Sequence, residues 1–112
     1  MRFRTLSPIC VSQNVVGEKH AQYVAPEQEQ FSQLLVQNLL RKQQAHQRQL
    51  TVPFRVLSKP EQKLIHVRGT KIRCYLFNFE LTAPTDLLEM GYFSGFGEKN
   101  SMGFGMVRLI NT

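Results

Sequence analysis

Apolar, β-prone residues recur at the start of the chain, mixed with arginine and threonine. Residues 2–11, RFRTLSPICV, therefore predict a strand. Pro8 favours an edge position or a bulge for this strand, because proline donates no hydrogen bond to a neighbouring strand. Residues 12–25 contain Gly17 and several polar groups, and predict a loop.

The next segment changes to the period of a helix. Pro26 is expected in its first turn, where the missing N–H of proline would have no partner in any case. Apolar residues then fall at i, i+3, i+4 and i+8 on one face, namely Phe31, Leu34, Leu35 and Leu39. Arg41 and Lys42 suit the negative C-terminal end, and the glutamine-rich tract at 43–49 is expected to fray beyond it.

A period-two pattern occupies the middle of the chain and predicts a β-hairpin. Ile65 and Val67 alternate along the first strand, and Gly69 with Thr70 offers the turn. The second strand carries apolar residues at every other position, namely Tyr75, Phe77, Phe79 and Leu81. Residues 51–59 are compatible with an additional short strand, which the pattern alone does not place.

A second, shorter helix is expected from Pro84, with Asp86 in its first turn and three residues facing inward, namely Leu87, Leu88 and Tyr92. Residues 104–110 predict a final strand. The resulting order is the βαββαβ arrangement of ferredoxin-like, RRM-like α+β folds, in which two helices cover one face of an antiparallel sheet. We therefore expect residues 1–112 to form one ferredoxin-like domain, a topology that hosts many functions.

The charge of the chain is positive and unevenly distributed. The net charge is +6, and residues 41–73 contain nine basic residues against one acid, Glu61. Residues 80–98 contain four acids and no lysine or arginine. A concentrated basic region suits a polyanion such as RNA, because basic side chains displace the counterions of the phosphates. The alternative, a charged surface that only keeps the protein in solution, stays open at this point.

The two cysteines, Cys10 and Cys74, lie far apart within apolar stretches. We expect buried free thiols in a reducing compartment; neither has metal-ligand spacing with a histidine, so no metal or cofactor is predicted. No apolar run approaches the roughly 18 residues that a membrane span needs, and the first residues lack the apolar region of a signal peptide. These features predict a cytoplasmic protein without membrane contact.

A glycine-rich segment, GFGEKNSMGFG at residues 95–105, precedes the last predicted strand. Its glycines permit positive φ and close approach of a ligand to the backbone, and successive N–H groups in such a loop can converge on an anion. The phosphate-binding pattern GxxxxGK[ST] and the dinucleotide pattern GxGxxG are both absent from it. From the residues alone, a plain connection between a helix and a strand is the simpler alternative.

The side chains of this segment add possible contacts of their own. Lys99 would bring a positive charge to a phosphate, while Asn100 and Ser101 would bring neutral donors for phosphate or sugar oxygens. Phe96 and Phe104 are suited either to sealing the core beneath the loop or to stacking on a base.

Two Gly-Phe-Gly triplets separated by five residues, in the extended form GFGEKNSMGFGMVRL, resemble the C-terminal glycine-rich loop of the CRISPR-associated RNA-processing endoribonucleases of the RAMP superfamily. LSPI at residues 6–9 and LLVQNLLRK at residues 34–42 agree with the same family in order and spacing. The resemblance implies metal-independent cleavage of CRISPR precursor transcripts within each repeat, by attack of a ribose 2′-hydroxyl on the adjacent phosphate. It also implies two ferredoxin-like domains in tandem, with this loop in the second domain and RNA in a basic cleft between them.

The chain has room for one such domain and resembles the C-terminal half. The resemblance implies that the catalytic histidine of the family lies in the N-terminal half, so no catalytic residue is assigned here. The expected partners are CRISPR repeat RNA and that N-terminal half, as part of the same enzyme or as a separate subunit. His20, His46 and His66 have no evident catalytic partner in the sequence.

Three hypotheses follow. The first is an RNA-binding half that holds repeat RNA and does not cut it alone. Its expected RNA-binding residues lie on the loop and on the predicted hairpin, namely Gly95, Gly97, Lys99, Asn100, Ser101, Gly103 and Gly105, and Arg68, Lys71 and Arg73. The second is an assembly module that dimerises by strand addition at residues 2–11. The third is a complete small nuclease that uses His66.

Overall fold

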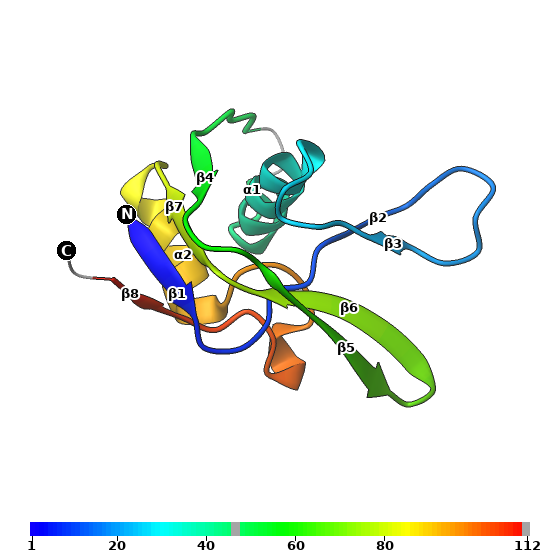
Figure 1. Cartoon of the computed structure of the whole chain (residues 1–112). Coiled ribbons are helices and arrows are strands. Elements are labelled where there is room, and N and C mark those ends of the chain that lie inside the picture. Colours follow the sequence, from blue (N-terminus) through cyan, green and yellow to red (C-terminus); the bar gives the residue numbers. More distant parts are fainter. Residues whose placement is uncertain (46–47, 111–112) are drawn as a thin grey trace.

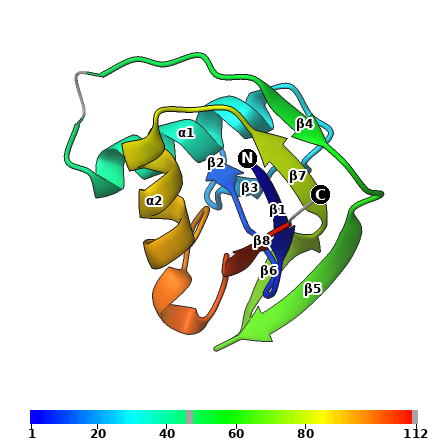
Figure 2. The ribbon, with the colours of Figure 1, turned by 90° about the vertical axis from the view of Figure 1, so that its left-hand side faces the viewer.

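The structure of the chain is a computed structural model that describes residues 1–45 and 48–110 (Figure 1). Four antiparallel strands form the main sheet in the order β4-β7-β1-β8. Their bounds are β1 (Arg2–Thr5), β4 (Phe54–Val56), β7 (Asn78–Leu81) and β8 (Val107–Leu109). Two helices, α1 (Gln30–Lys42) and α2 (Thr85–Ser94), lie together on one side of this sheet (Figure 2).

These six elements have the connectivity of a ferredoxin-like fold. Helix α1 connects β1 to β4, and α2 connects β7 to β8. The first and third strands, β1 and β7, pair in the centre of the sheet, whereas the second and fourth, β4 and β8, form its edges. The predicted α+β class and the βαββαβ order are therefore confirmed.

Two hairpins are inserted into this order and extend away from the main sheet in the same direction (Figure 1). One consists of β2 (Ser12–Gln13) and β3 (Gln22–Tyr23), in a region where the sequence predicted only a loop. The other consists of β5 (Glu61–Val67) and β6 (Thr70–Leu76). Its turn falls at Arg68 and Gly69, both with positive φ, as the common two-residue hairpin turn requires.

The second strand of the ferredoxin order was assigned wrongly from the sequence. The sequence analysis took the strand with Ile65 and Val67 as the second strand of the ferredoxin order, but these residues belong to the inserted β5. The second strand of the main sheet is instead the short β4, which lies within residues 51–59. The chain passes from β6 to β7 at Phe77, so one apolar alternation runs across two different sheets. The alternation itself is confirmed, because all four predicted residues are buried.

Strand β1 is central, so the predicted edge position of residues 2–11 is wrong. Phe3 has register partners on both sides, Phe79 in β7 and Leu109 in β8. The chain leaves the sheet after Thr5 and rejoins the β6 region only through a bridge at Ile9. Dimerisation by strand addition at β1 is therefore excluded, since both of its edges are occupied.

Of the three helix ends that the sequence predicted, two agree with the structure. Helix α1 begins at Gln30 and not at Pro26, because the side chain of Gln28 accepts a hydrogen bond from the N–H of Ala25 at 2.7 Å and closes a turn there. It ends at Lys42 as expected. Helix α2 runs from Thr85 to Ser94, directly after Pro84 as expected.

Two finer predictions at the C-terminal side need correction. Leu87 and Leu88 are buried as expected, but Tyr92 is 39% exposed and stacks edge-on with Phe93 outside the core. The last strand is shorter than residues 104–110, because Phe104 and the next two residues still belong to the loop.

Candidate nucleic-acid interface

The glycine-rich loop, residues 95–105, connects α2 to β8 and needs its glycines for packing. Gly97 has φ +75°, and a Cβ there would lie 2.6 Å from the carbonyl oxygen of Cys10. Gly105 has φ +81°, and its Cβ would lie 2.0 Å from the carbonyl oxygen of Phe96. These glycines let the loop lie directly on neighbouring backbone, which explains part of their spacing without any ligand.

Both phenylalanines of the loop belong to the interior. Phe96 is fully buried, and its ring lies 5.2 Å from Phe3 and 5.4 Å from Phe79 between ring centroids. Phe104 is also buried, in a second cluster with Ile72 of the β5–β6 hairpin. Of the two roles considered for these rings, sealing the core is the one that the structure shows.

The tip of the loop presents backbone donors. Lys99 has a left-handed backbone, with φ 60° and ψ 35°, and is followed by a short 3-10 turn, η1 (Asn100–Met102). Among the described residues, the N–H groups of Lys99, Asn100 and Ser101 have no hydrogen-bond acceptor. A left-handed residue followed by a right-handed one directs three successive N–H groups toward one point, the arrangement of an anion-binding nest.

Asn100 has an internal role that the sequence analysis did not foresee. Its Nδ2 donates to the carbonyl oxygens of Phe96 at 3.3 Å and Phe104 at 3.0 Å. The side chain therefore closes the loop from inside, and its backbone N–H is the group that remains available. Ser101 is exposed, and its hydroxyl makes no hydrogen bond within the described part of the chain.

Asn100→Asp should destabilise the domain, whereas Ser101→Ala should not. The aspartate would replace the two donated hydrogen bonds by a carboxylate facing two carbonyl oxygens, a loss of about 2–3 kcal/mol. Ser101→Ala should change the free energy of unfolding by less than about 0.5 kcal/mol, as surface substitutions commonly do. Urea denaturation followed by circular dichroism measures both values; equal effects would contradict the internal role of Asn100.

Contacts from two other segments hold the loop in place. The Nζ of Lys42, at the end of α1, donates to the carbonyl oxygens of Gly95 at 2.7 Å and Gly97 at 2.9 Å. The carboxylate of Glu98 accepts hydrogen bonds from the backbone N–H of Ser12 at 2.6 Å and from its hydroxyl at 2.8 and 2.9 Å. The sequence analysis missed both contacts, because Lys42 was interpreted only through the helix dipole.

Burial changes the acid–base properties of Lys42. The ammonium group lies partly inside the protein, and this desolvation lowers the pKa of Lys42 to about 8. In the described part of the chain, no carboxylate lies within ion-pair distance of it. Lys42 is therefore a cation that is held by backbone carbonyls alone.

The β5–β6 hairpin carries the second group of predicted RNA-binding residues. Lys71 and Arg73 lie on β6, where they face His66 and Leu64 of β5 across the ladder. All four side chains are exposed, and Arg68 lies exposed at the turn. The opposite face of the hairpin packs on Phe104 through the buried residues Ile72 and Cys74, so the hairpin and the glycine-rich loop share one hydrophobic cluster.

The basic segment at residues 41–73 does not form one continuous patch. Three of its side chains are paired with carboxylates, namely Arg48 with Asp86, Arg55 with Glu80 and Lys63 with Glu61. Within residues 1–45 and 48–110, six have no carboxylate within ion-pair distance, namely Arg41, Lys42, Lys59, Arg68, Lys71 and Arg73. Three of these six lie on the hairpin, which therefore carries half of the unpaired cations of the segment.

The open face of the main sheet is a further basic surface that the sequence analysis missed. Phe3 faces the helices, so the alternating side chains on the other face include four arginines, namely Arg2, Arg4, Arg55 and Arg108. Glu80 pairs with Arg2 and Arg55 and neutralises part of this charge. Arg4 and Arg108 lie opposite each other on neighbouring strands, an unfavourable arrangement for two like charges. Only the strand order reveals this pair.

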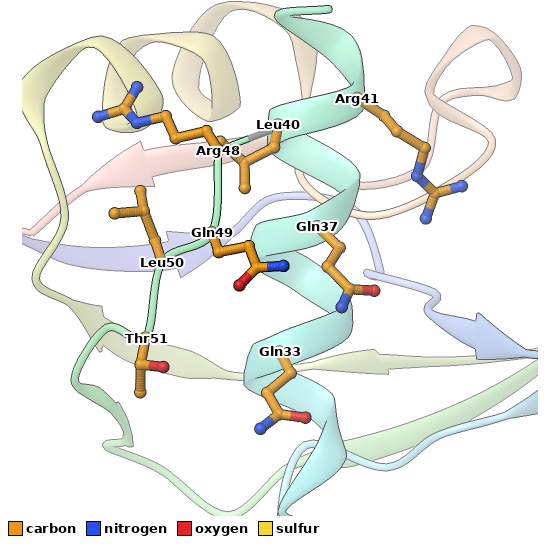
Figure 3. Close-up of a pocket in the computed structure, with 8 residues that line it drawn as sticks. All are labelled: Gln33, Gln37, Leu40, Arg41, Arg48, Gln49, Leu50 and Thr51. Atoms are coloured by element: carbon orange, nitrogen blue, oxygen red, sulfur yellow. The ribbon is translucent and has the colours of Figure 1, made fainter. Parts of the chain in front are cut away.

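A polar hollow lies between α1 and the segment that returns to β4 (Figure 3). Its lining is rich in glutamine and arginine, namely Gln33, Gln37, Leu40, Arg41, Arg48, Gln49, Leu50 and Thr51. Figure 3 shows the Gln49 side chain directed toward α1. None of the predicted RNA-binding residues lies in this hollow.

The described residues do not bring a histidine together with a catalytic partner. His20 and His66 are exposed, and His46 lies outside the described residues. Cys10 and Cys74 are buried free thiols as expected, and burial raises the pKa of Cys10 to about 12. Within the described ranges, no helix is long and apolar enough to cross a membrane, and no three potential ligands among His, Cys, Asp and Glu gather into a metal cluster.

The ferredoxin-like fold and the glycine-rich loop between α2 and β8 agree with the resemblance to the RAMP endoribonucleases that the sequence indicated. The family model described as CRISPR associated protein Cas6, C-terminal, matches residues 1–109. The chain therefore belongs to the Cas6 family and corresponds to its C-terminal domain. The family resemblance inferred from the glycine spacing is confirmed.

Named relatives and solved structures agree with this assignment. The chain is 32% identical over 109 residues to CRISPR-associated endoribonuclease Cas6 1 of Methanocaldococcus jannaschii, covering 93% of this chain and 43% of the relative. It is 34% identical over 111 residues to CRISPR-associated endoribonuclease Cas6 of Pyrococcus furiosus, covering 96% of this chain and 41% of the relative. The chain thus spans less than half the length of these relatives.

Two solved structures are similar in fold along almost the whole chain. One is described as CRISPR associated protein Cas6, with a TM-score of 0.83, and the other as a RAMP protein binding different RNA substrates, with a TM-score of 0.82. Each is 32% identical in sequence and is matched over 98% of this chain and 48% of its own.

Proposed function

We propose that this chain is the RNA-binding half of a CRISPR repeat endoribonuclease, and that it holds single-stranded repeat RNA without cleaving it alone. The observation that carries the proposal is the loop tip, where three successive N–H groups, which find no acceptor within residues 1–45 and 48–110, lie beside the Lys99 side chain. The named relatives are CRISPR-associated endoribonucleases, and for this reason we propose CRISPR repeat RNA as the ligand.

The proposed contacts divide into two kinds. The N–H groups of Lys99, Asn100 and Ser101 bind one phosphate of the RNA, together with the Lys99 ammonium and the Ser101 hydroxyl. The exposed cations of the hairpin, Lys71 and Arg73 with Arg68 at the turn, bind the phosphates that follow along the strand. The glycines Gly95, Gly97, Gly103 and Gly105 contribute through the backbone, because their conformations shape the loop.

The reaction itself is assigned to the family mechanism, in which the 2′-hydroxyl attacks the adjacent phosphate. General acid–base catalysis of this step needs a group with a pKa near neutrality, positioned within hydrogen-bond distance of the proton it transfers. We assign that group to the N-terminal half, as the family resemblance implies; within the described ranges, His20 and His66 are exposed. The role of this chain is to position the phosphate backbone.

A binding titration with repeat RNA over a range of salt concentrations tests the proposal. Each phosphate contact on a single strand contributes about −0.7 to the slope of log K against log salt, so four contacts predict a slope near about −3. We expect the RNA to be recovered intact from the same mixtures. Affinity that does not weaken with salt would contradict the phosphate contacts, and cleavage lost in His66→Ala would support the small-nuclease hypothesis.

A second candidate function, an assembly module with little RNA contact, is favoured by the outer edge of β8. This strand is an edge of the main sheet; its last residue, Leu109, is exposed, as is Met106 directly before it. Strand addition at this edge would produce an RNA-independent dimer. Light scattering without RNA distinguishes the two functions; a dimer whose mass is the same in Lys99→Ala would favour assembly, and a monomer would favour RNA binding.

A further inference from the structure

The Lys42 side chain makes contacts that its place at the end of α1 does not require. A lysine at a helix C-terminus interacts favourably with the helix dipole while its ammonium stays in water. Here the ammonium instead lies half-buried beneath the glycine-rich loop and donates to two loop carbonyls, those of Gly95 and Gly97. Two contacts from one cation fix the first turn of the loop relative to α1.

A half-buried Lys42 ammonium destabilises the folded protein unless its contacts compensate for the lost hydration. Partly removing an ammonium from water disfavours its charged form, and no carboxylate in the described part of the chain compensates for it. An ammonium has three N–H donors, and two of them are used by the loop carbonyls. The third donor and the positive charge are available to an anion at the loop.

We propose that Lys42 is a positioning residue that sets the shape of the glycine-rich loop for RNA, and that RNA binding is linked to the protonation of its ammonium. This inference rests on the proposed function, because it assigns the ligand of the loop to an RNA phosphate. The phosphate binds on the loop tip at Lys99–Ser101, and Lys42 acts on it through the backbone of Gly95 and Gly97.

The proposed pH dependence comes from Lys42 itself and not from the charged groups around it. A thiolate at Cys10 would favour the charged form of Lys42, but burial raises the pKa of Cys10 to about 12, so Cys10 is a neutral thiol between pH 7 and pH 9. On the loop, the carboxylate of Glu98 is held by Ser12, and Lys99 lies at the tip. On the helices, Arg41 is exposed beside Lys42, and Asp86 of α2 is held by Arg48.

The sign of the pH dependence follows from the lowered pKa. The free protein loses the Lys42 proton around pH 8, whereas a bound phosphate would favour the charged form. RNA affinity should therefore be about tenfold lower at pH 9 than at pH 7, since one linked proton changes affinity by at most about tenfold per pH unit. Folding stability changes in the opposite direction, because the unfolded chain, with an ordinary lysine, keeps its proton to higher pH.

The experiment compares the wild-type chain with Lys42→Met and Lys42→Arg. Methionine has a similar length and no donor, so the affinity for repeat RNA should fall about tenfold at pH 7 through the lost charge-assisted bonds. The difference between pH 7 and pH 9 should disappear in this variant. Arginine stays charged throughout, so Lys42→Arg should retain measurable affinity that is nearly the same at both pH values.

A second measurement is independent of RNA. The N–H of Phe96 donates to the carbonyl oxygen of Gly105, and the N–H of Gly105 donates to the carbonyl oxygen of Pro8. Hydrogen exchange of these two amides therefore reports opening of the loop. Exchange of both should be about tenfold faster in Lys42→Met than in wild type, in protein whose circular dichroism is unchanged. Lys99→Met is the matched control: it should lower RNA affinity at every pH, keep the pH profile, and leave the exchange unchanged.

The outcomes separate this inference from the proposed function. Wild-type protein that fails to bind RNA overturns the proposed function, and with it the linkage to RNA, while the exchange measurement still decides whether Lys42 shapes the loop. RNA binding with the same pH profile and the same exchange rates in wild type and Lys42→Met overturns the role of Lys42 and leaves RNA binding in place.

Discussion

Gly105→Ala is expected to destabilise the domain by more than about 4 kcal/mol, a loss that places it among the most damaging single substitutions. The added Cβ would lie 2.0 Å from the carbonyl oxygen of Phe96 and 2.8 Å from Nδ2 of Asn100. Neither group can move easily, because Phe96 is fully buried and Asn100 is bonded to two carbonyls. The N–H of Gly105 also donates to Pro8, so the backbone itself is fixed.

Gly103→Ala is the matched control, because it shares the unfavourable backbone and lacks the steric clash. Gly103 has φ +94°, and no atom of the described residues lies within 4 Å of its Cβ position. The Gly103→Ala substitution should lower the free energy of unfolding by only about 1–2 kcal/mol, which is the strain of a left-handed backbone in a residue other than glycine. Urea denaturation measures both, and a loss of 4 kcal/mol corresponds to a midpoint lowered by about 2 M for a slope near 2 kcal/mol per M. Equal midpoints in the two variants would show that the loop relaxes around Gly105.

The largest effect on RNA binding is expected from the double substitution Lys71→Gln and Arg73→Gln. Both side chains are exposed on one face of β6 without a carboxylate partner in the described part of the chain. Affinity for repeat RNA at low salt should fall about tenfold to thirtyfold, and the slope of log K against log salt should become shallower by about 1.4, because two single-strand phosphate contacts are lost. The folded state should be retained, since neither side chain is buried.

Arg55→Gln with Lys63→Gln removes the same charge from residues that are already paired. Arg55 is 3.2 Å from Glu80, and Lys63 is 2.8 Å from Glu61. If RNA contacts the unpaired cations of the hairpin, this control should lose less than about threefold in affinity, with little change of the slope. Similar losses in both double variants would mean that the RNA senses only the net charge and that the hairpin is not its binding surface.

The sequence predicted the class of fold because the residues that signal it act locally. The helical face that begins at Phe31 and the start of α2 after Pro84 depend on residues a few positions apart, and both are found in the structure. The alternation of Tyr75 to Leu81 also identified buried residues correctly. It could not show that Phe77 separates two sheets, because alternation reports which side chains are buried and not which strand lies beside them.

The main errors of the sequence analysis concerned the place of each strand within the main sheet. Pro8 suggested an edge strand, yet β1 is central, since Pro8 lies beyond the end of β1 at Thr5 and takes no part in the sheet. The short β4 carries only three residues and gives a weak pattern, although it supplies the second ferredoxin strand. Strand order depends on contacts between residues that lie from 23 (Val56 and Phe79) to 106 (Phe3 and Leu109) positions apart, and local patterns do not record them.

The glycine-rich loop is explained partly by its sequence and partly by the tertiary structure around it. By itself the sequence determined that residues 95–105 form a loop whose glycines permit positive φ, which the structure shows at all four, and the spacing of the two triplets indicated the family. Only the tertiary structure decided that Phe96 seals the core, that Asn100 closes the loop from inside, and that Lys42 supports it from α1. The reason is physical: backbone conformation follows from residue type and near neighbours, whereas the partner of a buried ring or a buried ammonium is set by the packing of distant segments.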